Sequence, residues 1–212
     1  MLKINEIFYS IQGESSYSGM PCIFIRLTYC NLRCSYCDTE DSFYEGQDMT
    51  IDEIINEIKK YNFKLIEVTG GEPLLQKESI VLMETLLNNN YKVMLETGGS
   101  LPINKVPLEV IKIIDFKCPS SKMEEKNDWT IIKNLQKHDE IKFVIGNEED
   151  YKWAKAMISL YQLDNICTIL FSPVYDKIEP KIISNWILKD NLRVRMQLQL
   201  HKIVWKAEMR GV

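Results

Sequence analysis

The segment Cys30-Asn31-Leu32-Arg33-Cys34-Ser35-Tyr36-Cys37 places three thiols within eight residues, directly after an apolar run that predicts a buried strand at residues 22–28. The whole chain has only six cysteines among 212 residues. The other three, Cys22, Cys118 and Cys167, lie apart in apolar or loop surroundings, where a cysteine usually serves as a small buried side chain. The grouping therefore indicates a metal site, with free thiols rather than disulfides.

The number of available ligands separates the two metal centres that cysteines usually form. A structural zinc ion is closed by four protein ligands, and the two histidines, His138 and His201, are remote in sequence from the three cysteines. An iron–sulfur cube held by three thiolates leaves one iron open to a cofactor or substrate. We therefore expect a 4Fe-4S cluster on Cys30, Cys34 and Cys37. A non-catalytic zinc-binding interaction module remains the alternative from another class of protein.

Outward from this segment, β-rich runs alternate with segments of helical period, as in a parallel sheet built from βα units. Strands are predicted at residues 22–28, 64–69, 92–96, 110–116, 140–145, 168–171 and 193–199, with a further edge strand within 4–13. Helices are predicted at residues 77–89, 130–136, 148–160 and 179–188, and from Thr50, which forms a capping box with Glu53. About six βα units are too few to close an eight-stranded barrel. An α/β fold with either an open, partial barrel or a doubly wound sheet remains, within a single domain of residues 1–212.

Composition limits the kind of partner. The chain is 45% hydrophobic and 26% charged, carries a formal net charge of -4, and has no long run of like charges. This charge favours neither nucleic acid nor an anionic membrane surface. There is no basic leader and no apolar stretch long enough to span a bilayer. We therefore expect a cytoplasmic protein that acts on a small molecule, with no nucleic-acid or membrane partner.

Polar, glycine-containing segments also follow other predicted strands. In Thr69-Gly70-Gly71-Glu72-Pro73, adjacent glycines let a ligand approach the backbone, and a carboxylate can accept hydrogen bonds from an ammonium group. Glu96-Thr97-Gly98-Gly99, Asp115-Phe116-Lys117 and Ser172-Pro173 follow the third, fourth and sixth strands. Because the carboxyl ends of parallel strands meet at one rim, these segments are expected to surround the same site as the cysteines.

The Cys-x3-Cys-x2-Cys spacing, with the aromatic Tyr36 before the last cysteine, resembles the signature of the radical S-adenosylmethionine (SAM) superfamily. The resemblance implies an open, partial βα barrel in which SAM chelates the open iron of the cluster. It also implies that reduction of SAM yields a 5'-deoxyadenosyl radical that abstracts hydrogen from the substrate. The SAM contacts implied by the resemblance are Tyr36, Asp38, Gly71, Glu72, Lys117 and Ser172.

Segments outside the cysteine motif narrow the resemblance to one family. Ser10-Ile11-Gln12-Gly13-Glu14, Cys37-Asp38-Thr39, Glu96-Thr97-Gly98-Gly99, Pro119-Ser120-Ser121-Lys122-Met123 and Arg210-Gly211-Val212 are similar to segments of the 7-carboxy-7-deazaguanine synthase family. That resemblance implies a lyase of 7-deazapurine (queuosine) biosynthesis, which converts 6-carboxy-5,6,7,8-tetrahydropterin to 7-carboxy-7-deazaguanine with loss of ammonia. It further implies a homodimer, an unidentified electron donor, and a magnesium ion with Thr39 as ligand. The implied substrate contacts are Gln12, Gly13, Glu14, Arg26 and Thr69.

These contacts suit a small, polar anion. Arg26 offers a rigid fork for a carboxylate, and Gln12 and Glu14 present groups suited to an aminopyrimidinone edge. A second hypothesis is an activating enzyme that installs a glycyl radical on a protein partner, because such enzymes share the cysteine motif. No catalytic side chain is predicted, and no role is assigned to Cys118, His201 or Trp205.

Overall fold

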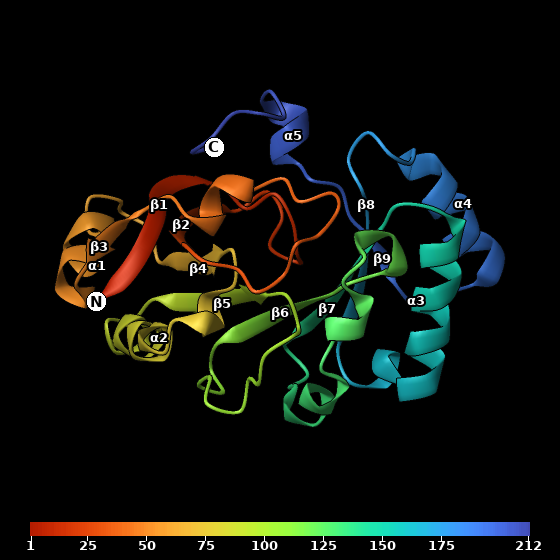
Figure 1. Cartoon of the computed structure of the whole chain (residues 1–212), viewed down its shortest axis with the longest axis horizontal. Coiled ribbons are helices and arrows are strands. Elements are labelled where there is room, and N and C mark those ends of the chain that lie inside the picture. The colour runs from red at the N-terminus through yellow and green to blue at the C-terminus, as the bar shows by residue number, and fades with distance from the viewer.

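Nine strands form one sheet in the order β3-β1-β2-β4-β5-β6-β7-β8-β9 in the computed structural model, which describes residues 1–212 (Figure 1). The strands are β1 (Leu2–Ile11), β2 (Pro21–Leu27), β3 (Gln47–Met49), β4 (Leu65–Gly70), β5 (Lys92–Thr97), β6 (Ile111–Phe116), β7 (Glu140–Ile145), β8 (Thr168–Pro173) and β9 (Arg195–Met196). The helices are α1 (Ile51–Ile58), α2 (Glu78–Asn88), α3 (Glu148–Tyr161), α4 (Pro180–Asp190) and α5 (His201–Val204).

Seven of the strands, β2 and β4 to β9, run parallel, whereas β1 pairs antiparallel with both β2 and β3. Helices α1 to α4 lie in the crossovers β2–β4, β4–β5, β7–β8 and β8–β9. The crossovers β5–β6 and β6–β7 have no α-helix and pass through loops and short 3-10 helices. Six of the predicted strands correspond to β2 and β4 to β8, and each predicted end lies within two residues of the observed one.

The edge strand predicted within residues 4–13 is β1: the three-residue β3 pairs only with Leu2 to Ile4, and the rest of its outer side has no partner strand. Two other predictions about elements need correction. The segment 130–136 is a short 3-10 helix, Trp129–Asn134, whose Trp129 ring stacks on Phe116 with 4.3 Å between centroids. The last strand shrinks from 193–199 to β9, because the chain beyond it leaves the sheet and turns back towards Glu14.

Helices α1 to α4 all cover one face of the sheet. Their buried residues, such as Ile54, Leu82, Ala154 and Ile183, belong to the same apolar cluster of 36 residues as the strand residues on that face. This arrangement excludes a doubly wound sheet, in which helices cover both faces. Since β3 and β9 remain unpaired on their outer sides, the α/β fold is an open, partial barrel as predicted. None of its helices combines the length and apolar character needed to cross a bilayer.

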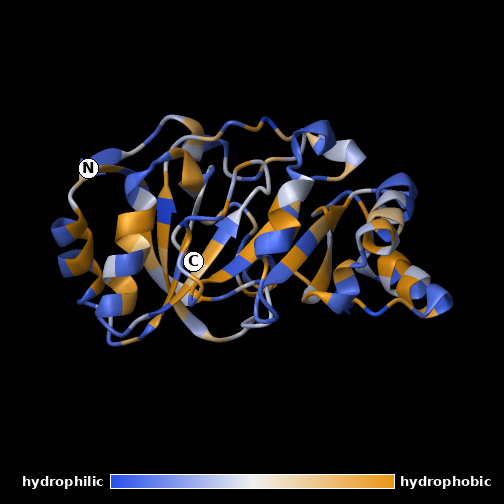
Figure 2. Cartoon of the chain, turned by 90° about the horizontal axis from the view of Figure 1, so that it is seen from below, coloured by the Kyte–Doolittle hydropathy of each residue, from blue (hydrophilic) through white to orange (hydrophobic).

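The opposite face of the sheet, which we call the inner face, has two halves. Side chains alternate between faces along each strand. Near the amino ends of the parallel strands, the inner face carries a small apolar cluster that includes Leu65, Met94 and Ile113. Near the carboxyl ends, two residues further along these strands, it carries Glu67, Glu96 and Asp115, and blue segments interrupt the mostly orange strands (Figure 2). The second half therefore forms a polar surface inside the barrel.

The predicted capping box at the start of α1 is confirmed. Thr50 Oγ1 accepts from Glu53 N at 3.2 Å, and the Glu53 carboxylate accepts from Thr50 N at 2.7 Å. Ile54, Ile55 and Ile58 then lie on the buried side of the helix. The local sequence thus sets where α1 begins, and its apolar stripe sets which side faces the sheet.

Thr50→Ala is expected to lower the free energy of unfolding by about 1 kcal/mol, because an orphan amide of the first helical turn loses its acceptor. Urea denaturation measures the change. Thr85→Ala in the middle of α2 is the matched control: its hydroxyl bonds only to the Val81 carbonyl within the helix, so its loss costs little. Equal destabilisation by both substitutions would contradict the role of the cap.

Candidate active site

A cavity of about 530 Å³ opens on the inner face at the carboxyl ends of the parallel strands. Its size suits a small ligand together with a cofactor. Its lining comes from the β1–β2 loop, the strand ends, the cysteine segment (residues 30–37) and the residues that follow β9. In Figure 1 the orange cysteine segment and the dark blue α5 lie over the sheet on the side away from α2. The two ends of the chain thus meet at one site.

The cysteine segment is anchored by main-chain bonds to neighbouring strand ends. Tyr29 O accepts from Glu72 N at 2.7 Å, and Ser35 N donates to Ser121 O at 3.0 Å. Gly71 lies so close that a Cβ atom there would be 2.3 Å from Tyr29 O. The glycine at this position is therefore required by the approach of the β4 turn to the cysteine segment.

Cys30, Cys34 and Cys37 line the cavity together, and all three are free and half-buried. Burial raises the pKa of the Cys34 thiol to about 11, against the attraction of Lys117. A 4Fe-4S cube held by three thiolates binds each of them to a different iron, and three free thiols that line one cavity fit that group.

We call the wall next to the three cysteines the cysteine side. Tyr36, Asp38, Gly71, Lys117 and Ser172, all predicted SAM contacts, line the cavity. Near the cysteines, Lys117 Nζ pairs with Asp115 Oδ2 at 2.9 Å. The other carboxylate oxygen, Oδ1, is buried without a hydrogen-bond partner. It is an acceptor available to a hydroxyl or amino group of SAM, so the donor and acceptor set fits the cofactor.

Glu72, the remaining predicted SAM contact, is fully buried and does not itself line the cavity, although its partners Thr97 and Gly98 do. The carboxylate accepts from Gly98 N and Thr97 Oγ1, each at 2.8 Å, and from Leu74 N at 3.1 Å. Glu72 therefore connects the turns after β4 and β5, because only those donors can satisfy a carboxylate at this depth.

We call the part of the lining around Arg26 the arginine side. The predicted substrate contacts Gln12, Gly13, Glu14, Arg26 and Thr69 all line the cavity. Gln12 Nε2 donates to Glu67, and its Oε1 accepts from Glu14 N at 2.9 Å. These bonds fix the loop and leave the amide a second N–H and a second lone pair for a ligand.

Arg26 keeps part of its fork available. Its Nε donates to Glu6 Oε1 at 2.8 Å, and its guanidinium carbon lies 5.8 Å from the centroid of the Phe8 ring. Both partners of the ion pair are only 19% exposed. Glu6, a residue that the sequence did not single out, therefore fixes the orientation of the guanidinium while its terminal nitrogens remain for a ligand.

Thr39, the predicted magnesium ligand, also lines the cavity, and its hydroxyl donates to Asp38 Oδ1 at 3.0 Å. The hydroxyl oxygen retains lone pairs for a metal. Magnesium often keeps few protein ligands when substrate and water supply the others. The site thus fits the ion, with one neutral protein oxygen and one adjacent carboxylate.

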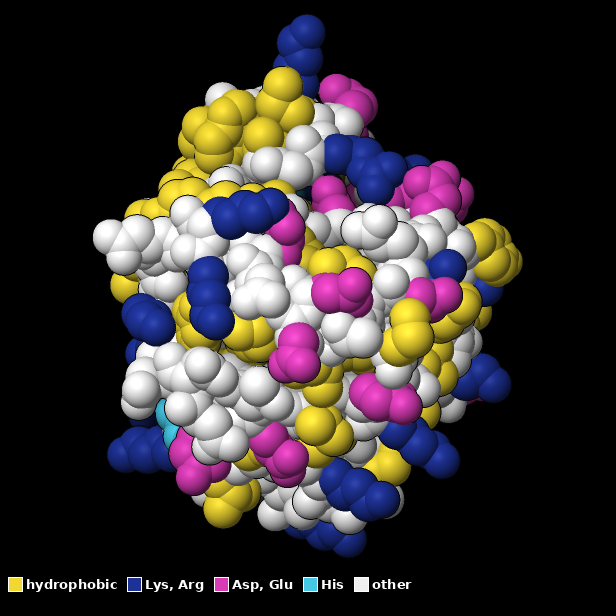
Figure 3. All heavy atoms as spheres, turned by 90° about the vertical axis from the view of Figure 1, so that its left-hand side faces the viewer, with side chains coloured by type: hydrophobic (Ala, Val, Ile, Leu, Met, Phe, Trp, Pro, Cys, Tyr) yellow, Lys and Arg dark blue, Asp and Glu magenta, His cyan; other side chains and the backbone are white.

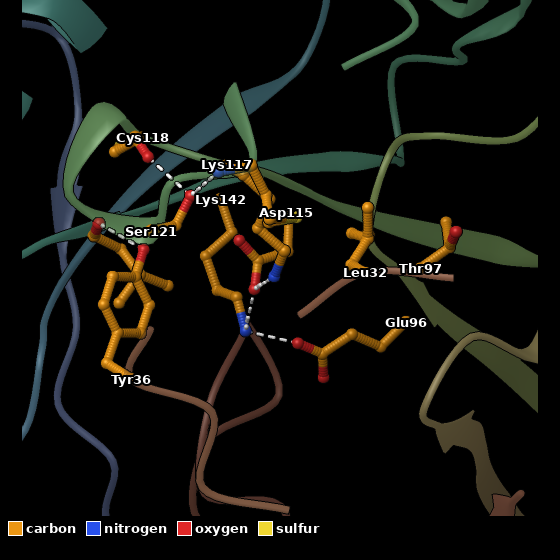
Figure 4. A network of polar contacts seen from close by, with 12 residues as sticks. Leu32, Tyr36, Glu96, Thr97, Asp115, Lys117, Cys118, Ser121 and Lys142 are labelled. Atoms are coloured by element: carbon orange, nitrogen blue, oxygen red, sulfur yellow. Dashed lines mark hydrogen bonds and ion pairs between the residues drawn. The ribbon is translucent and has the colours of Figure 1, made fainter. Parts of the chain in front are cut away.

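Sequence reasoning missed two buried ionisable side chains on the inner face, Glu67 and Lys142. Lys142 Nζ contacts Glu14 Oε2 at 2.8 Å. It also contacts Asp115 Oδ2 at 3.5 Å and the Glu96 carboxylate (Figure 4). Both residues stand inside mainly apolar strands. The sequence does contain a signal for both residues. Each is a charged residue type at a strand position whose side chain, by alternation, points to the inner face.

The segment after β9 closes the cavity from above. Leu200 N donates to Gly13 O at 2.9 Å, and Lys202 Nζ contacts Asp38 Oδ2 at 2.6 Å. His201 lines the cavity, packed so closely that a Cβ on Gly13 would lie 2.1 Å from its Nδ1.

Two further side chains without a predicted role lie outside the cavity lining. Trp205 is half-buried, and Cys118 is fully buried in the main apolar cluster. At the top of the face in Figure 3, hydrophobic side chains gather over the last part of the chain, where Ile203, Val204 and Met209 are exposed.

Comparisons with known proteins agree with this site. Residues 24–115 match the model of the radical SAM superfamily. The 7-carboxy-7-deazaguanine synthase of Chlorobaculum tepidum is 46% identical over the whole of this chain and 97% of its own length. The enzyme of the same name from Koribacter versatilis is 44% identical over the full length of both chains, and that from Clostridium acetobutylicum is 37% identical over 99% of each.

Solved structures give the same fold. QueE from Escherichia coli superposes with a TM-score of 0.79 over 94% of each chain at 21% identity. SuiB of Streptococcus suis bound to the precursor peptide SuiA matches with a TM-score of 0.59 over 81% of this chain and 46% of its own. The full-length identities to several synthases show more than a fold: the chain belongs to the 7-carboxy-7-deazaguanine synthase family of radical SAM enzymes, which act with a 4Fe-4S cluster and SAM.

Proposed function

We propose that this enzyme converts 6-carboxy-5,6,7,8-tetrahydropterin to 7-carboxy-7-deazaguanine with loss of ammonia, as a carbon–nitrogen lyase of 7-deazapurine (queuosine) biosynthesis. One observation carries the proposal: the three cysteines and the guanidinium-bearing Arg26 line a single cavity. A radical source and an anion-binding group thus face the same space. The synthase names of the full-length relatives support the same substrate.

The chemistry supplied by a bound 4Fe-4S cluster and SAM is abstraction of a hydrogen atom from the substrate. The protein binds, orients and shields the reactants. On the cysteine side, Tyr36, Asp38, Gly71, Lys117 and Ser172 are proposed to bind SAM.

On the arginine side, the guanidinium of Arg26 is proposed to bind the pterin carboxylate through its terminal nitrogens, because Glu6 already occupies Nε. Gln12, Gly13, Glu14 and Thr69 are proposed to contact the rest of the substrate. Bonds to Glu67 and to the Glu14 amide hold Gln12 in place for this contact. This division gives a charged group at the carboxylate and polar groups around the ring.

We further propose that magnesium binds at Thr39, where substrate oxygens would complete its coordination. We propose two further partners: an unidentified electron donor that reduces the cluster, and a second copy of the chain in a homodimer. We also propose that the enzyme is located in the cytoplasm. Residues 1–212 would act as one radical SAM domain, because residues from both ends of the chain line one cavity.

Neither alternative explains the arginine side. A glycyl-radical activating enzyme acts on a protein backbone, for which the half-buried Arg26–Glu6 pair inside a cavity offers no docking surface. A zinc module needs a fourth protein ligand, and of the two histidines His138 is not part of the cavity lining; the full-length relatives are radical SAM synthases. The synthase accounts for both walls.

Cys37→Ser is expected to lose most of the cluster, because a serine oxygen is a poor substitute for a thiolate ligand. After anaerobic reconstitution, wild-type protein should bind about four irons per chain, and the variant well under half as many. Cys167→Ser is the matched control, since Cys167 is buried away from the cavity and should leave the iron content unchanged. Wild-type iron content in Cys37→Ser, or zinc in place of iron in the wild type, would overturn the assignment.

Arg26→Lys is expected to lower kcat/KM about 10- to 100-fold, mainly through KM, because lysine cannot reproduce a charge-assisted fork to a carboxylate. The assay follows deazapurine formation from SAM and the carboxytetrahydropterin with reduced, reconstituted enzyme. Arg193→Lys, at an exposed position outside the cavity, controls for the exchange itself. If the wild-type enzyme makes no deazapurine, the substrate assignment fails; an unchanged KM in Arg26→Lys removes Arg26 from the site.

Glu67 makes the free energy of unfolding depend on pH. Its side chain is only 3% exposed. Burial, together with the nearby carboxylates of Glu96 and Glu14, raises its pKa well above the ordinary value. The folded protein therefore holds this proton more tightly than the unfolded chain. The contribution of Glu67 to stability is full below the unfolded pKa of about 4.3 and is lost as the pH rises towards the raised pKa.

Glu67→Gln removes this loss and keeps a hydrogen-bonding partner for Gln12, so its stability relative to wild type should increase as the pH rises above about 4.3. Urea unfolding at several pH values measures the difference. Glu84→Gln, on the exposed side of α2, is the control and should follow the wild type. A constant difference between Glu67→Gln and wild type across this range would show that Glu67 titrates alike in both states.

A further inference from the structure

Lys142 is a buried lysine in the middle of β7, on the inner face of the sheet, and is 4% exposed. Its ammonium group contacts three carboxylates from three different parts of the chain. Glu14 comes from the β1–β2 loop, Glu96 from β5 and Asp115 from β6. In Figure 4 the Lys142 nitrogen lies between the carboxylates of Glu96 and Asp115, at the centre of the network.

These three contacts join the two walls of the cavity. Asp115 is paired with Lys117, which acts on the cysteine side. Glu14 stands on the arginine side, where it also accepts from Gln197 and Gln199 at 3.1 and 3.0 Å. Through Lys142, one ammonium group therefore links the wall next to the cluster cysteines to the wall that faces Arg26.

The link between the two sides is made of ion pairs. Glu14, Glu96 and Asp115 are like charges gathered in a largely buried space, and Lys142 is the group that contacts all three. Removing one partner of a buried ion network leaves the remaining charges without compensation. Without the ammonium group the carboxylates would repel one another and move apart, and the two walls would lose their fixed separation.

A second buried lysine, Lys112, forms an ion pair away from the cavity and serves as the comparison for Lys142. Lys112, on the neighbouring strand β6, is 1% exposed and pairs with Asp139 at 3.2 Å, and its ammonium donates to Val110 O at 2.9 Å. None of these residues lines the cavity. Lys112 is thus matched to Lys142 in burial and pairing but is separate from the site.

We propose that Lys142 is a positioning residue: its ammonium group holds Glu14 on the arginine side at a fixed place relative to Asp115 and Lys117 on the cysteine side. The inference rests on the proposed function, in which substrate and SAM occupy those two sides. The distance between the atom that loses hydrogen and the radical source then depends on Lys142, although Lys142 itself need not touch either molecule.

Lys142→Met keeps a long apolar stem and removes the charge. The reconstituted variant is expected to bind iron normally and to cleave SAM to 5'-deoxyadenosine. The deazapurine formed per 5'-deoxyadenosine should fall on the order of 100-fold, because a misplacement of about 1 Å can cost that much. Lys142→Arg keeps the charge and should recover most of the loss. If Lys142→Met does not fold, Lys142→Gln supplies the same measurement.

Lys112→Met is the matched control. It should lower the Tm as a buried ion pair is broken, yet leave the ratio of deazapurine to 5'-deoxyadenosine at the wild-type value. An unchanged ratio in Lys142→Met, or an equal fall in both variants, would overturn the proposal.

A crystal structure of Lys142→Met gives a second measurement that needs no substrate. Glu14 and Asp115 should have moved apart, and unchanged carboxylate positions would overturn the role of Lys142. Failure of the wild-type enzyme to make any deazapurine would instead overturn the proposed function, and the displacement of Glu14 would still decide whether Lys142 positions the two walls.

Discussion

The alternation of side chains along seven parallel strands is the constraint on which the rest of this structure depends. One side of each strand, with residues such as Ile66, Leu95 and Phe143, is covered by α1 to α4 and forms the main core. None of these four helices covers the carboxyl half of the other side, over which only the cysteine segment and the short α5 lie. Because parallel strands end at one rim, this half collects the side chains of six strand ends into a single cavity.

Placing so many charges on that half has a cost that the structure offsets locally. An isolated buried carboxylate is destabilising, but here Glu14, Glu96 and Asp115 share Lys142, and Asp115 also contacts Lys117. Glu67, which bonds to Gln12 and forms no ion pair, has a raised pKa, caused first by burial and then by Glu96 and Glu14. Burial also raises the pKa of Glu96, whereas Lys142 holds the pKa of Glu14 below its ordinary value against the effect of burial.

The cavity also depends on contacts between distant parts of the chain. The cysteine segment is fixed by the turn after β4, which approaches so closely that only glycine fits at position 71. Leu200 and Lys202, near the other end of the chain, bond to Gly13 and Asp38 and cover the opening. Binding and shielding from water, which radical chemistry requires, are thus built from segments almost 190 residues apart in sequence (Gly13 and Leu200).

The sequence by itself determined much of this protein, because its strongest signals are local. The cysteine spacing predicted the cluster ligands, apolar runs located the six main parallel strands, and Thr50 with Glu53 located the start of α1. Strand-end motifs identified part of the cavity lining, since the carboxyl ends of parallel strands must converge. Only the tertiary structure decided that Glu72 is buried against Thr97 and Gly98, that Gln12 bonds to Glu67, and that Lys142 contacts Glu14, Glu96 and Asp115. Those outcomes depend on which groups from distant strands meet in a space without water, and pairing of that kind leaves no periodic or local trace in the chain.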